Sequence, residues 1–201
     1  MPRDGNLFGQ LRRRSETDGR ESDDSLLSRV ARDESAAWAV LVDRHLGPVT
    51  RYANWILRDN AAAEDVAQET FFRLTKKASE WEPGGASLKT WLFRVARNLC
   101  IDRKRAKTAL PIDTIEDAPD SDNAFEVDRR IDIEKAVQLS LEKLPERQKT
   151  AIILVHFEGF SGNEAAKALD ISVEAVGSLL ARARKALRID LSGALPDLLG
   201  E

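Results

Sequence analysis

The apolar residues of this chain recur mostly at steps of three and four, the spacing that places side chains on one face of an α-helix. Gly47-Pro48 lies inside one of these stretches and is expected to kink the helix or interrupt it, because proline lacks the backbone donor used in a helix interior. Helices are therefore predicted over residues 24–30, 34–45, 49–58, 61–77, 87–107, 127–144 and 146–158, with a further helical pair after Phe160. The pattern predicts an all-α protein.

The helix predicted over residues 61–77 has one apolar and one polar face. Val66, Thr70, Phe71 and Leu74 are spaced to face a core. Because residues three and four apart share a helix face, four polar residues lie side by side on the outside: Asp65, Gln68, Glu69 and Arg73. From spacing alone a solvated surface is the preferred interpretation, and a binding surface is the alternative.

The segment from Glu82 to Gly85, with the sequence EPGG, ends this helical run. Trp81 stands at its edge and is expected to be exposed or half-exposed, where an indole is able to stack on a base. A lid on the core is the alternative role for this side chain.

The helix predicted over residues 87–107 combines an apolar stripe with a strong local excess of positive charge. It contains seven cations and one acid, in a chain whose net charge is −3. A solvated charged face is the ordinary explanation of such a run. Here the next segment, residues 108–128, carries seven acids and no cation. This abrupt reversal favours an anionic partner, such as nucleic acid, for the basic helix.

The acidic segment also contains Pro111 and Pro119, which is a composition typical of a linker. The sequence therefore predicts two small helical domains joined by a flexible acidic linker. The expected boundaries are a disordered tail at 1–23, a first domain at 24–107, the linker at 108–128, a second domain at 129–193 and a tail at 194–201.

The sharpest local pattern follows Phe160 and has the spacing of a helix-turn-helix. Ser161 and Glu164 form a capping box, Asp170 and Ile171 make the turn, and Ser172 caps the next helix. A plain helical hairpin is the alternative. The second helix and its cap offer an outward set of side chains for DNA contact: Ser172, Glu174, Gly177, Ser178, Arg182, Arg184 and Lys185.

Composition argues against several classes of protein. No apolar run approaches the roughly 20 residues of a membrane span, so a cytoplasmic protein is expected. The single cysteine, Cys100, lies on the apolar stripe, which favours a small buried side chain over a redox switch. His156 has no second histidine or cysteine at ligand spacing, so no metal is expected. With only two isolated histidines and no phosphate-binding glycine loop, the chain is not expected to be an enzyme or to bind a cofactor.

Both predicted domains resemble one family, the extracytoplasmic-function (ECF) group of bacterial sigma factors within the sigma-70 family. The resemblance covers about residues 24–190. AEDVAQETF at 63–71 is similar to the family's core-binding motif, and WLFRVARN at 91–98, followed by Asp102 and Arg103, is similar to its minus-ten helix. LEKLPERQ at 141–148 and the residues 158–161 resemble the approach to the domain that reads the minus-thirty-five element.

The resemblance implies that Asp65, Gln68 and Glu69, with Arg73 beside them, bind the clamp of core RNA polymerase, which overrides the preference for a solvated surface. The loop 80–86 would hold a flipped base of the minus-ten element. The acidic linker would cross the polymerase toward its RNA exit path. The residues expected at minus-ten DNA are Trp81, Lys89, Trp91, Arg94, Arg97, Asn98, Arg103 and Arg105.

The outward set after Ser172 would contact the minus-thirty-five element, and an anti-sigma factor would hold the protein inactive. Asp170 replaces the glycine usual in the family's turn, and Gly177 and Leu179 replace residues that are polar or charged in many members. The main alternative is an ordinary helix-turn-helix repressor or activator, which would bind its operator without polymerase.

Overall fold

The computed structural model describes residues 21–109 and 129–199, with side chains at 21–107 and 136–192, and these residues confirm the all-α fold in two helical domains. The predicted tail up to residue 20 and the predicted linker from residue 110 to 128 lie outside the described residues. The helices are α2 (Asp23–Val30), α3 (Ser35–Leu57), α4 (Asn60–Ala78), α5 (Leu88–Ala109), α6 (Arg129–Glu142), α7 (Glu146–Ile152), the π-helical turn η2 (Ile153–Phe157), α8 (Gly162–Leu169) and α9 (Val173–Leu199).

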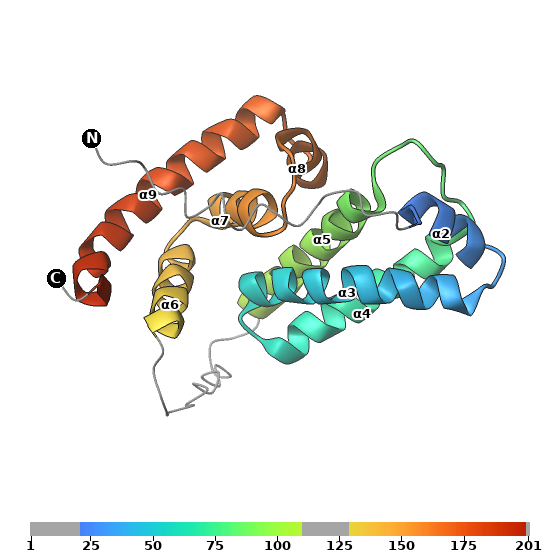
Figure 1. Cartoon of the computed structure of the whole chain (residues 1–201), viewed down its shortest axis with the longest axis horizontal. Helices are drawn as coiled ribbons and strands as arrows, with labels where there is room; N and C mark the ends of the chain where they lie inside the picture. The colour runs from blue at the N-terminus through green and yellow to red at the C-terminus, as the bar shows by residue number, and fades with distance from the viewer. Residues whose placement is uncertain (1–20, 110–128, 200–201) are drawn as a thin grey trace.

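The first domain packs α3, α4 and α5 along one another, with the short α2 across one end (Figure 1). The apolar face predicted for α4 is confirmed, since Val66, Thr70, Phe71 and Leu74 are all buried. Asp59 caps this helix by accepting a hydrogen bond from the backbone N–H of Ala62 at 2.9 Å.

Helix α3 corrects the prediction at Gly47-Pro48, because it runs through Pro48 without interruption. Proline removes one hydrogen bond of the helix, yet the residues on both sides continue a single buried face. That face carries Leu41, His45, Val49 and Tyr52, at steps of four, four and three. Burial along the whole face outweighs the loss of one bond.

Helix α2 begins slightly earlier than the sequence pattern suggests. Ser22 is the N-cap, and its hydroxyl accepts a hydrogen bond from the Ser25 N–H at 3.2 Å. Asp23 then adds negative charge at the positive end of the helix dipole. The ordered structure therefore includes residues that the sequence pattern assigns to the tail.

The second domain contains the predicted helix-turn-helix, formed by α8 and α9. The capping box between Ser161 and Glu164 is present, and Asp170 takes the left-handed conformation of the turn with φ of 56°. Helix α6 and the residue after it are tied to α9, because Ser140 and Lys143 donate to the carboxylate of Asp190, at 2.6 and 2.7 Å. Helix α9 continues to Leu199, beyond the residue 193 at which the sequence suggests a tail.

The second domain lies directly against the first. The rings of Phe93 and Phe160 meet edge to face at 5.0 Å between centroids, and those of Trp55 and Phe157 lie 5.5 Å apart. Figure 1 shows α8 beside one end of α5. The helical spacing of Phe157 predicts that it faces the core of its own domain. In the structure Phe157 is 37% exposed and packs on the first domain instead.

Candidate functional site

The outer face of α4 carries the predicted polymerase-binding residues. Asp65, Gln68 and Arg73 are exposed, and Glu69 is half-buried. Arg73 Nε donates to Glu69 at 2.8 Å, an ion pair across one helical turn. Asp65 pairs with Arg103 of α5 at 3.2 Å. The structure thus places the four residues on one surface.

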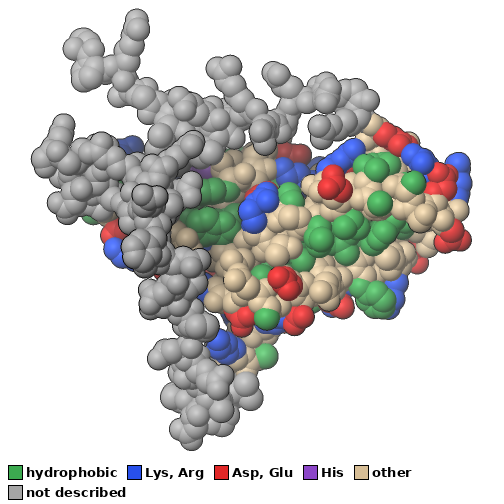
Figure 2. Space-filling model, turned by 60° about the horizontal axis from the view of Figure 1, so that its bottom comes forward, with side chains coloured by type: hydrophobic (Ala, Val, Ile, Leu, Met, Phe, Trp, Pro, Cys, Tyr) green, Lys and Arg blue, Asp and Glu red, His purple; other side chains and the backbone are tan. Residues whose placement is uncertain are grey.

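An exposed aromatic residue lies on the same helix. Phe72 is 55% exposed, and Lys76 Nζ stands 4.4 Å from the centre of its ring. Figure 2 shows hydrophobic side chains gathered in a band on the first domain, with acidic and basic side chains around it. Sequence reasoning passed over Phe72, although the spacing that turns Phe71 inward points its neighbour toward a different side of the helix.

Trp81 occupies the start of the loop between α4 and α5. Its side chain is half-buried, its Nε1–H donates to Asp24 Oδ1 at 2.9 Å, and its ring meets Trp91 edge to face at 6.3 Å. The following residues 82–87 are exposed, and Gly84 has a φ of 86°. Trp81 therefore packs at the edge of the core and stays partly exposed, while its stacking on a base remains a prediction.

Helix α5 presents its predicted DNA-binding residues in three different surroundings. Arg94, Asn98 and Arg105 are exposed. Arg97 and Trp91 are half-buried, and Arg97 lines a hollow between α5 and the second domain. The half-buried residue Arg103 donates to the carbonyl of Ala62 at 3.0 Å as well as to Asp65.

Lys89 is enclosed between the two domains. Its Nζ stands 4.5 Å from the centre of the Phe160 ring and donates to the backbone carbonyl of Glu158. Burial lowers the pKa of Lys89, while the nearby carboxylates Glu158 and Glu164 act in the opposite direction. In this arrangement Lys89 faces protein rather than a free DNA-binding surface.

Ion pairs surround this contact between the domains. Arg58 pairs with Glu142, Lys104 pairs with Glu146 at 3.1 Å, and Arg51 lies 3.9 Å from Glu158. In each pair the first domain supplies the cation and the second supplies the acid. Part of the positive charge beside the basic helix is thus neutralised by the second domain.

The helix-turn-helix presents its predicted contact set to solvent. The whole set is exposed: Ser172, Glu174, Gly177, Ser178, Arg182, Arg184 and Lys185. Ser172 Oγ accepts from the Ala175 N–H at 3.2 Å, which confirms the predicted cap. Arg184 Nε also donates to His156 Nε2 at 3.3 Å, so its orientation is set partly within the domain.

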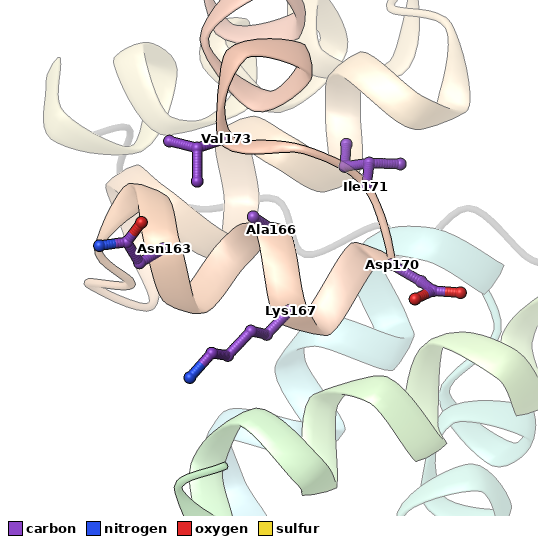
Figure 3. Close-up of a pocket in the computed structure, with 6 residues that line it drawn as sticks. All are labelled: Asn163, Ala166, Lys167, Asp170, Ile171 and Val173. Carbon is purple, nitrogen blue, oxygen red and sulfur yellow. The ribbon is translucent and has the colours of Figure 1, made fainter. Parts of the chain in front are cut away.

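The angle between α8 and α9 forms a pocket, shown in Figure 3. Asn163 and Lys167 project from α8, while Ile171 and Val173 lie on the turn and at the start of α9.

No three His, Cys, Asp or Glu side chains within the described residues form a group able to hold a metal. The helices at 21–109 and 129–199 include none long and apolar enough to cross a bilayer.

The two domains define a class of helical protein. One domain carries an exposed polar α4 face beside a basic helix, and the other carries a helix-turn-helix. Comparison with known families identifies both domains. Residues 41–109 match the model described as Sigma-70 region 2, and residues 134–187 match Sigma-70, region 4. The chain belongs to the sigma-70 family and is an RNA polymerase sigma factor of the ECF type.

Individual relatives agree. The chain is 31% identical over 184 residues to the RNA polymerase sigma-H factor of Pseudomonas aeruginosa, covering 83% of this chain and 92% of that protein. It is 32% identical over 173 residues to the ECF RNA polymerase sigma factor SigL of Mycobacterium tuberculosis, covering 82% of this chain and 94% of SigL. The assignment decides against the alternative of an ordinary helix-turn-helix repressor or activator.

Solved structures show the same fold. CnrH, in complex with the cytosolic domain of CnrY, has a TM-score of 0.66 and 26% identity, covering 86% of this chain and 99% of that one. The sigma factor RpoE, in complex with the anti-sigma factor NepR from Bartonella quintana, has a TM-score of 0.60 and 23% identity, covering 77% of this chain and 96% of RpoE.

Proposed function

We propose that this sigma factor divides its contacts among three surfaces. The outer face of α4 binds core polymerase through Asp65, Gln68, Glu69 and Arg73. The loop 80–86 and the basic face of α5 bind the minus-ten element, and α9 binds the minus-thirty-five element. The observation that carries the proposal is the grouping of the α4 set on one helix face, with Asp65, Gln68 and Arg73 exposed, while cations dominate the exposed charge of α5 and α9.

The predicted DNA contact of Lys89 requires the domains to move apart. Lys89 is covered by Phe160 and Glu158, so its contact with a DNA phosphate needs the second domain to leave α5. The ion pairs of Arg58 and Lys104 with the second domain must break in the same step. Binding of core polymerase to α4 does not need this step, because the exposed α4 residues lie outside the interdomain contact.

In this proposal the chain performs no covalent chemistry and acts with polymerase in the cytoplasm. An anti-sigma factor holds it inactive there. The relative CnrH supports such control, since it is solved with the cytosolic domain of CnrY. A partner that contacts both domains would gain effective concentration from the tether. Pull-down from native cells without crosslinker should recover this partner. The proposal of sequestration fails if only core polymerase is recovered under non-inducing conditions, or if one isolated domain binds the partner as tightly as the whole chain.

The α4 assignment is tested by charge reversal at Glu69. Glu69→Lys should weaken binding to core polymerase, because it breaks the pair with Arg73 and places a cation in the acidic set. Asp43→Lys is the matched control, since Asp43 is an exposed acid of α3 outside the stretch 63–71. Core affinity is measured by fluorescence anisotropy of labelled sigma factor. Equal affinities for the wild type and Glu69→Lys would exclude this surface as the docking site.

A further inference from the structure

Helix α2 lies before residue 41, where the match to Sigma-70 region 2 begins, yet it contacts the loop that follows α4. The contact is the hydrogen bond from Trp81 Nε1–H to Asp24 Oδ1, at 2.9 Å, between residues far apart in the chain. An indole has a single donor, so a fixed acceptor restrains where the Nε1 edge of its ring points. The ring of Trp81 then stands at 87° to that of Trp91.

The acceptor is fixed because α2 is anchored independently of the loop. Leu26 and Leu27 are fully buried in the core of the first domain. Asp23 Oδ2 lies 2.7 Å from His45 Nε2, and its other oxygen accepts from Arg44, both on α3. Asp24 therefore holds its carboxylate at a position set by α3 and the core.

The loop itself has little else to hold it. Residues 82–87 are exposed, and Gly84 and Gly85 give the backbone wide conformational freedom. Adding a side chain at Gly84 would meet no atom within 4 Å. The Trp81 backbone N–H bonds to the Ala78 carbonyl at 3.3 Å, and the ring at the start of this loop is oriented by its packing on the core edge, by Asp24 and by Trp91.

We propose that Asp24 is a positioning residue for promoter recognition. By holding Trp81 against Trp91, it keeps one edge of the loop 80–86 in the orientation that receives an unpaired base of the minus-ten element. The inference rests on the proposed role of this loop. It extends the recognition site to α2, a helix outside the matched family region.

The experiment uses holoenzyme assembled from core polymerase and full-length variants. The probe is a single-stranded oligonucleotide carrying the minus-ten element of a promoter that wild-type holoenzyme selects from a random library. Its partner probe has the central base of that element replaced. The ratio of the two affinities measures base discrimination, a quantity that simple loss of stability does not change. Core affinity and melting temperature are measured for every variant.

Asp24→Ala should reduce discrimination about tenfold, as expected for one hydrogen bond to a charged group, and leave core affinity unchanged. Asp24→Asn keeps an acceptor oxygen and should restore most of the discrimination. Trp81→Phe keeps an aromatic ring without the donor, so adding Asp24→Ala to it should cause no further loss. Arg29→Ala is the matched control, since it removes the α2 ion pairs to Glu21 and Glu34 without touching Trp81.

Three results would overturn the inference. The first is equal discrimination in Asp24→Ala and the wild type, and the second is equal loss in Asp24→Ala and Arg29→Ala. The third is a full further loss when Asp24→Ala is added to Trp81→Phe.

Trp81→Ala separates this inference from the proposed function. If Trp81→Ala impairs minus-ten binding but Asp24→Ala does not, only the positioning role fails, whereas an unimpaired Trp81→Ala removes the loop's proposed role as well.

Discussion

Replacing Phe157 with alanine should loosen the contact between the two domains without unfolding either one. Phe157 is 37% exposed, and its ring lies 5.5 Å from that of Trp55 across the contact. Burying a whole phenylalanine contributes about 1.5–3 kcal/mol, and an aromatic pair adds about 0.5–1.5 kcal/mol. Phe157 stays 37% exposed, so only part of a full burial is at stake. We therefore expect a loss of about 2 kcal/mol, roughly a thirty-fold shift toward the open state.

The assay is single-molecule energy transfer between dyes at positions 32 and 188, which are exposed residues of the first and second domain. The ratio of high-transfer to low-transfer molecules gives the free energy of opening. Phe72→Ala is the matched control, because it makes the same substitution at an exposed phenylalanine of α4. Unchanged populations in Phe157→Ala, or an equal shift in Phe72→Ala, would refute the reasoning that the aromatic contact holds the domains together.

Further predictions follow from single side chains. The pKa of Lys149 is lowered to about 8 from an ordinary value of 10.5. Burial is the main cause, and the positive charges of Arg58 and Lys104 add to it. The folded protein then binds fewer protons than the unfolded chain between these values, so this lysine makes stability rise with pH from about 8 to 10.5. Lys149→Met should raise the melting temperature at pH 7, and its advantage should shrink across that window; a constant advantage would contradict the assignment. Arg105→Ala should lower the log-log salt slope of holoenzyme binding by about 0.9 on duplex or 0.7 on single-stranded DNA, and an unchanged slope would count against a phosphate contact. Gly177→Ala should stabilise the second domain by about 1 kcal/mol in thermal melting, since an added Cβ meets nothing within 4 Å. If it also impairs reading of the minus-thirty-five element, the glycine serves close approach to DNA, whereas undiminished promoter selection would exclude that role.

The local elements were predictable because their signals lie within a few residues of each other. The capping box at Ser161 and Glu164 and the turn at Asp170 depend on neighbouring backbone groups, and the structure has both. The buried face of α4 follows from helical periodicity alone. The continuous path of α3 through Pro48 was not predictable in this way, because burial on both sides decides it.

The tertiary contacts left no such signal. Lys89 belongs to a basic helix, and nothing in its spacing shows that Phe160, far along the chain, covers it. Phe157 has helical spacing like its neighbours, yet its partner is Trp55 of the other domain. Asp24 is one of two adjacent acids at the start of a helix, and only the fold shows that it faces Trp81 while Asp23 faces His45.

The central claim is that this chain directs core polymerase to promoters, and footprinting tests it most directly. The DNA is a promoter selected from a random library by the holoenzyme, probed with the chain alone, core polymerase alone and both together. Protection of the minus-ten and minus-thirty-five elements, with transcript formation, should require both components. Equally tight protection by the chain alone, with no transcript when core polymerase is added, would contradict the account.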